Sequence, residues 1–301
     1  MSNAPPPLPL TETNNPRTVE IDRLATRAIL EIINAEDQIV IDAVRTELDH
    51  ITAAAEAVYA RLVQGGRLIY VGAGTSGRLG VVDASEMPPT YNAPHGVVIG
   101  VIAGGDTAMF RSVEGAEDKP ELGRDDIVRL EVNERDAVLG IAASGRTPYV
   151  IGALQEANRR GALTISLACT YPAPVHDTAA LYIAPLTGPE VIEGSTRMKA
   201  GTATKLVLNM LSTTVMIKLG KTYGNLMVDL QPTNQKLRER ARRIVERTTG
   251  LNAADAQRLL DECGDVKTAL VAHHAHVSPE TARERLTHAQ GSVRRALEEK
   301  A

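Results

Sequence analysis

The sequence predicts an α/β fold, in which a doubly wound, Rossmann-like parallel sheet follows N-terminal helices and precedes a small C-terminal helical bundle. Three observations lead to this prediction. From Glu20 to Gln64, apolar residues recur at helical spacing without an internal Pro or Gly. Short apolar runs then alternate with helical stretches, as expected for a parallel sheet covered on both faces. Beyond Asn234 the chain becomes charged and helical throughout.

Five short apolar runs are the predicted strands: RLIYVGAG, GVVIGVIAGG, AVLGIAASG, ALTISLAC and LYIAP. After Pro189 we expect a long helix that packs on the sheet and begins within residues 190–199. In the C-terminal part, Asn252, Asp265 and Ser278 are residue types that favour helix starts.

These patterns predict three parts of the chain. Residues 1–17 are rich in Pro and Asn and lack periodicity, so we expect a mobile tail or an arm lying on a neighbour. Residues 18–234 form the predicted catalytic domain. Residues 235–301 form the predicted helical domain.

Composition excludes several classes of function. The chain has 301 residues, a net charge of −4, 3% aromatic residues and a single Phe, Phe110, which disfavours nucleic-acid binding. The two cysteines, Cys169 and Cys263, have neither CxxC nor zinc-like spacing and indicate a reducing compartment. No signal peptide or membrane-spanning run is recognisable. We therefore expect a cytoplasmic protein that binds a small polar molecule without a metal.

Two hydroxyl-rich turns are the clearest local signals. Each follows a predicted strand and precedes a helix: Gly72–Arg78 (GAGTSGR) and Ala143–Pro148 (ASGRTP). Carboxyl ends of parallel strands meet at one edge of the sheet, so the two turns should lie together. Helix N-termini and hydroxyls together bind a phosphate without a cationic side chain. The predicted phosphate-binding residues are Thr75, Ser76, Gly77, Ser144, Gly145 and Thr147.

These turns admit alternatives to phosphate binding. The first turn matches GxGxxG, but a dinucleotide site expects an acidic residue at the end of the next strand, and Asp106 comes slightly late. A P-loop would require a Lys that is absent between Gly72 and Gly80. The glycines could also simply permit tight turns while the hydroxyls cap helices. The occurrence of two such turns favours phosphate binding.

Several longer motifs make the chain similar to the N-acetylmuramic acid 6-phosphate etherase family, whose members are sugar isomerase (SIS) domain proteins. These motifs are GAGTSGRLG, DASEMPPTY, VEGAED, GIAASGRTPY, GPEVIEGSTRMKAGTATKLVLNMLST and GNLMVDL, and the match begins near Leu10. By this resemblance, Glu86 matches the proton donor and Glu117 the second catalytic acid. Position 87 is Met where many relatives have Cys.

The resemblance implies a lyase reaction without a cofactor, in cell-wall amino-sugar recycling. The D-lactyl ether of N-acetylmuramic acid 6-phosphate would be eliminated, and water would then add to give N-acetylglucosamine 6-phosphate. Glu86 would protonate the lactate oxygen and activate water, and Glu117 would take the C2 proton. Two alternatives stay open: a phosphosugar isomerase, and a non-catalytic phosphosugar-sensing regulator.

The resemblance also implies further contacts with the substrate. Ser195, Arg197 and Lys199 are expected to reach the carboxylate or phosphate, although Ser195 as a helix cap and Arg197 as a surface ion pair explain the sequence equally well. SIS domains pair with their sites near a subunit interface, so we expect a homodimer. His273, His274 and His276 lack a metal-binding pattern, and we expect them on a solvated helix.

Overall fold

The computed structural model describes residues 8–230 and 235–298, which separate into two compact units. The first unit comprises Met1–Ser85 and Gly96–Ser212, and the second comprises Glu86–His95 and Thr213–Ala301. In its C-terminal part the second unit begins at Thr213. It also takes in a short segment from within the predicted catalytic domain, the segment that carries Glu86.

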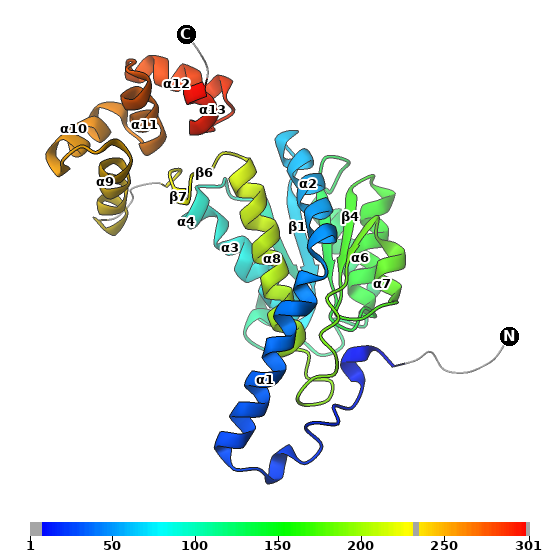
Figure 1. The fold of residues 1–301 in the computed structure, drawn as a ribbon. Helices are drawn as coiled ribbons and strands as arrows, with labels where there is room; N and C mark the ends of the chain where they lie inside the picture. The colour runs from blue at the N-terminus through cyan, green and yellow to red at the C-terminus, as the bar shows by residue number, and fades with distance from the viewer. Residues whose placement is uncertain (1–7, 231–234, 299–301) are drawn as a thin grey trace. The chain divides into compact units, whose positions relative to one another are not determined.

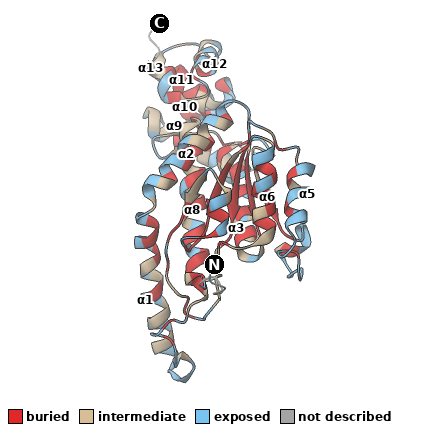
Figure 2. Ribbon diagram, turned by 90° about the vertical axis from the view of Figure 1, so that its right-hand side faces the viewer, coloured by how far each residue is buried: buried red, intermediate tan, exposed pale blue. Residues whose placement is uncertain are grey.

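A parallel sheet of five strands forms the centre of the first unit and confirms the predicted fold class. Its order is β2-β1-β3-β4-β5. Every residue of β1 and β3 is buried, and Figure 2 shows the strands between layers of helix. Burial on both faces explains why these strands are continuous apolar runs. The strands are β1 (Leu68–Gly72), β2 (Val98–Ile102), β3 (Ala137–Ile141), β4 (Leu163–Leu167) and β5 (Leu181–Ile183).

Helices cover both faces of the sheet (Figure 1). From β1 the chain crosses to β2 on one side, whereas from β3 it crosses to β4 in the opposite direction. Because such crossovers are right-handed, the helix that follows β1 and the helix that follows β3 lie on opposite faces of the sheet. One face carries α2 (Leu48–Val63), α3 (Gly74–Ser85) and α8 (Lys199–Lys218), and the other carries α5 (Pro120–Arg129), α6 (Pro148–Arg159) and α7 (Pro174–Thr178).

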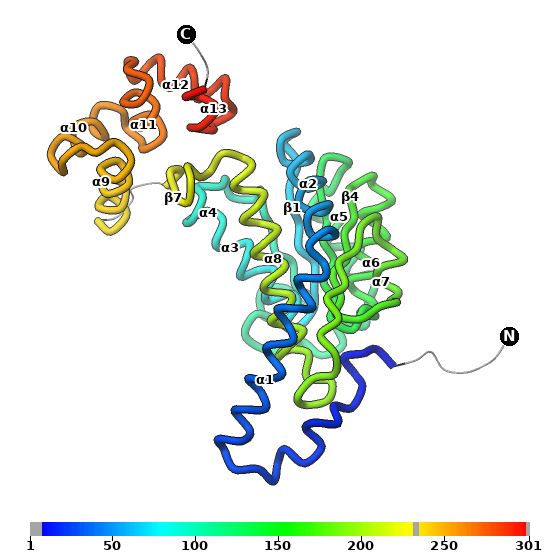
Figure 3. The backbone as a smooth tube through the Cα atoms, in the orientation of Figure 1, coloured from blue at the N-terminus to red at the C-terminus, as the bar shows by residue number. Residues whose placement is uncertain are grey.

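The N-terminal arm lies on its own chain. Leu10 N donates a hydrogen bond to Thr170 Oγ1 (3.1 Å), and Asn14 Nδ2 donates one to Glu193 Oε2 (3.2 Å). Figure 3 shows the arm passing beside the loop that precedes α8. In the described part of this segment, residues 8–17, hydrogen bonds thus connect the arm to the rest of its own chain. The arm contains η1 (Leu10–Glu12) and η2 (Ile21–Arg23) and leads into α1 (Thr26–Arg45).

The second unit has its own apolar core, which extends from Val228 to Ala296. The predicted helix starts are confirmed: the side chains of Asn252, Asp265 and Ser278 each accept a hydrogen bond from the backbone N–H three residues later. The elements of this unit are α4 (Met87–Tyr91), the antiparallel pair β6 (Thr222–Tyr223) and β7 (Leu226–Met227), and α9 (Gln235–Thr249), α10 (Ala253–Cys263), α11 (Val266–Ala275), α12 (Pro279–His288) and α13 (Val293–Glu298).

Across residues 8–230 and 235–298, no helix has both the length and the apolar character needed to cross a bilayer.

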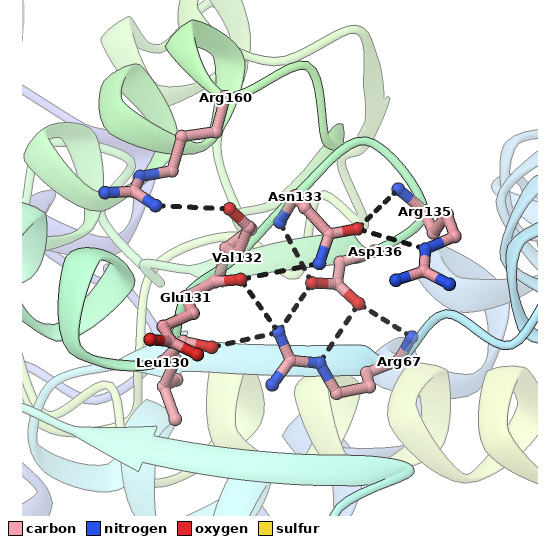
Figure 4. A network of polar contacts seen from close by, with 8 residues as sticks. All are labelled: Arg67, Leu130, Glu131, Val132, Asn133, Arg135, Asp136 and Arg160. Atoms are coloured by element: carbon pink, nitrogen blue, oxygen red, sulfur yellow. Dashed lines mark hydrogen bonds and ion pairs between the residues drawn. The ribbon is translucent and has the colours of Figure 1, made fainter.

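An ion pair between the half-buried Arg67 and the buried Asp136 joins the amino-terminal ends of β1 and β3 (Figure 4). Arg67 directly precedes β1 and Asp136 directly precedes β3. Arg67 donates to Asp136 through its backbone N (2.9 Å), Nε (3.1 Å) and Nη2 (2.7 Å). The backbone N–H of Asn133 also donates to the carboxylate (3.1 Å). Burial alone would raise the pKa of Asp136, but these hydrogen bonds and the charge of Arg67 hold it below its ordinary value.

We expect Asp136→Asn to lower the free energy of unfolding at pH 7 by about 2 kcal/mol, because it removes the ion pair. The pKa of Asp136 lies below its ordinary value of 3.8, so its stabilisation is complete above that value and is lost as pH falls through the folded-state pKa. Denaturant unfolding should therefore show a gap between native protein and variant at pH 7 that narrows at acidic pH. Asp125→Asn, in an exposed pair with Arg124, is the control and should change little.

Candidate functional site

The two hydroxyl-rich turns meet at the carboxyl edge of the sheet, as the sequence predicted. β1 and β3 are adjacent, and the chain turns from each directly into a helix, α3 or α6. Because β2 lies on the other side of β1, the chain reverses its direction across the sheet between these two strands. Doubly wound sheets bind ligands at such a switch point.

Glycines shape the first turn. A Cβ on Gly72 would lie 2.6 Å from Gly77 N, and a Cβ on Gly77 would lie 2.6 Å from Gly72 O, so the strand end and the first helical turn touch backbone to backbone. Gly74 starts α3 with φ +53°, in the left-handed region that glycine favours. This tight turn places Thr75 and Ser76 in the first turn of the helix, where backbone N–H groups lack helical partners.

The second turn also depends on glycine. Gly145 has φ +71°, and a Cβ there would lie 2.3 Å from Ala173 Cβ. Thr147 precedes α6, but its side chain makes no capping hydrogen bond. The hydroxyls of this turn and of the first turn have no hydrogen-bond partner among the described residues: those of Thr75, Ser76, Ser144 and Thr147. Helix capping therefore does not account for them, and they are available to a ligand.

Both turns line one hollow of about 420 Å³, which also has acidic walls. Glu117, predicted to be catalytic, is among its lining residues. The backbone O of Glu117 accepts a hydrogen bond from Tyr149 N (3.0 Å), which ties this acidic loop to the start of α6. The lining residues with side-chain polar groups are Glu12, Thr75, Ser76, Glu117, Asp118, Ser144, Arg146, Thr147 and Thr196.

Glu86 does not line this hollow. Helix α3 runs antiparallel to β2: a Cβ on Gly77 would lie 2.7 Å from Ile102, at the carboxyl end of β2, whereas a Cβ on Gly100 would lie 2.5 Å from Val81 Cα. The 12 residues of α3 cover roughly 17 Å, so its last residue lies toward the opposite edge of the sheet. Glu86 follows directly and is exposed, without a side-chain cap hydrogen bond.

The segment that carries Glu86 is held within the second unit. Asn92, the C-cap of α4, donates to Asp229 Oδ1 (3.4 Å), and Asp229 Oδ2 accepts from Lys221 Nζ (2.8 Å) and Lys267 Nζ (2.7 Å). Burial would raise the pKa of Asp229, but the two lysines hold it below its ordinary value. This cluster connects α4 to α11 and thereby to the core of the helical bundle.

Helix α8 begins at the last residue of the range expected from the sequence. The helix begins at Lys199, not earlier, because the buried Glu190 carboxylate accepts the N–H groups of Lys199 and Ala200 (both 2.9 Å) and so caps α8. Burial raises the pKa of Glu190. Ser195 is therefore neither a helix cap nor a lining residue. Arg197 is exposed and likewise does not line the hollow, whereas Thr196 does.

Lys199 occupies a buried ion pair instead of the hollow. Its side chain is 1% exposed, and its Nζ lies 2.6 Å from Glu36 Oε2. Arg17 of the N-terminal arm binds the other oxygen of Glu36 (2.5 Å). Burial would raise the pKa of Glu36, but hydrogen bonds from Lys199 and Asn15 and both positive charges hold it below its ordinary value. Through Glu36, Lys199 is thus linked to the arm, and it is not among the lining residues of the hollow.

Glu12 is one of the lining residues that were not predicted from the sequence, together with Asp118 and Arg146. It lies in the arm, and a Cβ on Gly194 would come within 2.9 Å of its Oε2, so arm and loop meet closely at the rim. Low periodicity and Pro-rich composition led to the prediction of a tail. The only available signal was the start of the family resemblance near Leu10.

The described part of the chain contains no group of three or more His, Cys, Asp or Glu side chains suited to a metal ion. His273 and His274 lie in the last turn of α11, and His276 is its C-cap. Cys169 and Cys263 are both buried and free, as expected for small apolar residues.

Fold and site together define the class: a doubly wound sheet with two hydroxyl-rich helix starts at its switch point is an SIS domain. Residues 50–158 match the model of the glucokinase regulatory protein N-terminal SIS domain. The fold resembles a phosphoheptose isomerase from Francisella tularensis, with a TM-score of 0.51 and 17% identity over 64% of this chain and 97% of that chain. This likeness concerns the fold alone.

Sequence relatives identify the family within this class. The chain is 53% identical over 289 residues to an N-acetylmuramic acid 6-phosphate etherase from Caldanaerobacter subterraneus, covering 96% of this chain and 94% of the relative. It is 49% identical over 288 residues to the etherase from Rhodopirellula baltica, covering 95% of each. The chain belongs to the N-acetylmuramic acid 6-phosphate etherase family.

We expect the double variant Ser76→Ala with Ser144→Ala to bind N-acetylglucosamine 6-phosphate at least about 30-fold more weakly, because it removes two hydroxyls that donate to a charged phosphate. Titration calorimetry at fixed salt measures the change. Ser85→Ala is the matched control, since Ser85 lies at the far end of α3 with its hydroxyl bonded to Val82 O. Equal affinity in the double variant and the native protein would contradict phosphate binding by the two turns.

Proposed function

We propose that this protein cleaves the D-lactyl ether of N-acetylmuramic acid 6-phosphate, giving N-acetylglucosamine 6-phosphate and D-lactate. The observation that carries the proposal is the hollow at the switch point, where two hydroxyl-rich helix starts lie beside Glu117. Family membership supports the particular substrate.

The phosphate is best placed between the starts of α3 and α6. Both helices are 12 residues long and present backbone N–H groups at their N-termini, where the macrodipole favours an anion. The hydroxyls of Ser76, Ser144 and Thr147 supply further donors. Arg146 adds the positive charge of a guanidinium to this wall. The sugar then extends from the phosphate toward the acidic side of the hollow.

The chemistry follows from the open-chain sugar. Its C1 aldehyde acidifies the C2 proton, so a base can remove that proton while the C3–O bond breaks and lactate leaves with a proton on its oxygen. This step leaves a C2–C3 double bond conjugated to the aldehyde. Water then adds its oxygen to C3, and C2 regains a proton. The net reaction consumes one water and releases one D-lactate.

Two carboxyl groups in different protonation states serve these steps. We assign removal of the C2 proton to Glu117, because it lines the hollow that holds the sugar. We assign protonation of the lactate oxygen and activation of water to Glu86, which the family motif DASEMPP supports.

The position of Glu86 in the sequence bears on how a complete site could be assembled. Glu86 follows Ser85 at the end of α3 that lies away from the phosphate-binding turns, and it is not among the lining residues of the hollow. We propose that the protein is a homodimer in which Glu86 of each chain serves the hollow of its partner. The reaction would take place in the cytoplasm, as part of cell-wall amino-sugar recycling.

Incubation of the native protein with N-acetylmuramic acid 6-phosphate should release D-lactate, measured with a D-lactate dehydrogenase assay. In deuterated water, Glu117→Gln should lower both lactate release and C2 exchange by about 10²- to 10⁴-fold. Glu86→Gln should lower lactate release while C2 exchange continues. Exchange without lactate release in the native protein would indicate an isomerase, and neither activity would indicate a regulator.

Mixing of the two inactive variants tests whether Glu86 acts across a dimer. If Glu86→Gln and Glu117→Gln chains exchange at random, half of the dimers are mixed and each has one complete site, so activity should return to about a quarter of the native value. Subunit exchange is confirmed by mass difference. No recovery despite exchange would show that both glutamates act within one chain.

A further inference from the structure

A second hollow, of about 340 Å³, adjoins the phosphate-binding hollow. The two share Ala73, Gly74 and Glu117 among their lining residues, so Glu117 stands where they meet. The second hollow lies between the start of α3 and the loop after β2. Its lining residues are Ala73, Gly74, Arg78, Ala103, Ala108, Ser112, Val113, Glu114, Gly115, Ala116 and Glu117.

Arg78 is the cationic side chain among the described residues that line this hollow. Its Nε donates a hydrogen bond to Met109 O (3.0 Å), in the short helix η3 (Asp106–Met109), and this bond fixes the guanidinium. Its Nη1 and Nη2 have no hydrogen-bond or ion-pair partner among the described residues. A guanidinium held on one side and open on the other presents a fork that matches a carboxylate.

The charged side chains that line the second hollow limit which ligand groups it can bind. Glu114 and Glu117 both line it, so an anionic group would be repelled unless a cation offsets them. Arg78 forms no ion pair with either glutamate and therefore has its charge available to a ligand. An anionic ligand group with two oxygens could accept hydrogen bonds from both Nη atoms. The positive charge of Arg78 would then offset the repulsion between this group and the carboxylates of Glu114 and Glu117.

The proposed substrate has such a group at the required place. Glu117 acts at C2, and the lactyl ether is on the neighbouring C3. The chain from the phosphate-bearing C6 to C2 spans four carbon–carbon bonds, roughly 5 Å when extended, so a phosphate in the first hollow leaves C2 near the boundary. The lactyl group then extends beyond Glu117.

We propose that Arg78 binds the carboxylate of the lactyl group and so determines specificity for a sugar that carries a 3-O-linked hydroxy acid. The inference rests on the proposed function and adds to it a binding place for the leaving group. Since the carboxylate is present in both substrate and transition state, Arg78 contributes mainly to KM and little to kcat.

The test compares substrate with product, which lacks the lactyl carboxylate. In a Glu117→Gln background, which slows turnover, titration calorimetry measures binding of N-acetylmuramic acid 6-phosphate and N-acetylglucosamine 6-phosphate. Arg78→Met should weaken substrate binding by about 10- to 100-fold, the usual effect of a charge-assisted hydrogen bond, and change product binding by less than about 2-fold. Arg78→Lys should recover part of the loss. In the otherwise native protein, Arg78→Met should raise KM with little change in kcat.

Arg111→Met is the matched control, because Arg111 is exposed in the same loop region and does not line either hollow. Equal weakening of substrate and product would show that Arg78 only holds η3 in place and would overturn the inference, as would unchanged binding of both. A native protein that releases no D-lactate would refute the proposed function. Lactate release together with unchanged substrate affinity in Arg78→Met would refute only this inference.

Discussion

The pairing of β1 with β3 is the constraint on which the candidate site depends. At the amino-terminal ends of these strands, the half-buried Arg67 and the buried Asp136 form an ion pair that joins them. At the carboxyl ends, the same pairing brings together the N-termini of α3 and α6 with their free hydroxyls. A phosphate bound between two helix N-termini would receive donors from both segments, and adjacent strands at a switch point place two such termini together.

A buried cluster of charged side chains holds the N-terminal arm and the loop before α8 beside the hollow. Glu36 holds both Lys199, at the start of α8, and Arg17, in the N-terminal arm. A buried carboxylate must have partners, so this cluster stabilises the arm and the loop before α8 in one arrangement. As a result Glu12 and Thr196 reach the rim of the hollow. Lys199 thus supports the site through the backbone it anchors.

The two glutamates of the family motifs have different places. Glu117 lies on a loop at the carboxyl edge of the sheet, whereas Glu86 follows a helix that runs away from that edge. Only 31 residues separate them in sequence. Helix α3 crosses the height of the sheet between the first hydroxyl-rich turn and Ser85, the residue before Glu86, and the proposed homodimer is our account of how both glutamates could serve one site. Asp229 and its two lysines explain how the bundle can position the segment that carries Glu86.

The sequence by itself determined the parallel sheet, the two hydroxyl-rich turns, the helix starts at Asn252, Asp265 and Ser278, and the family. Each of these depends on local patterns: continuous apolar runs, glycine beside hydroxyls, and capping residues. Tertiary structure alone decided the place of the arm, the burial of Lys199 and the capping of α8 by Glu190. These features depend on ion pairs and hydrogen bonds between residues as far apart as 163 positions, as for Lys199 and Glu36, which no local pattern specifies.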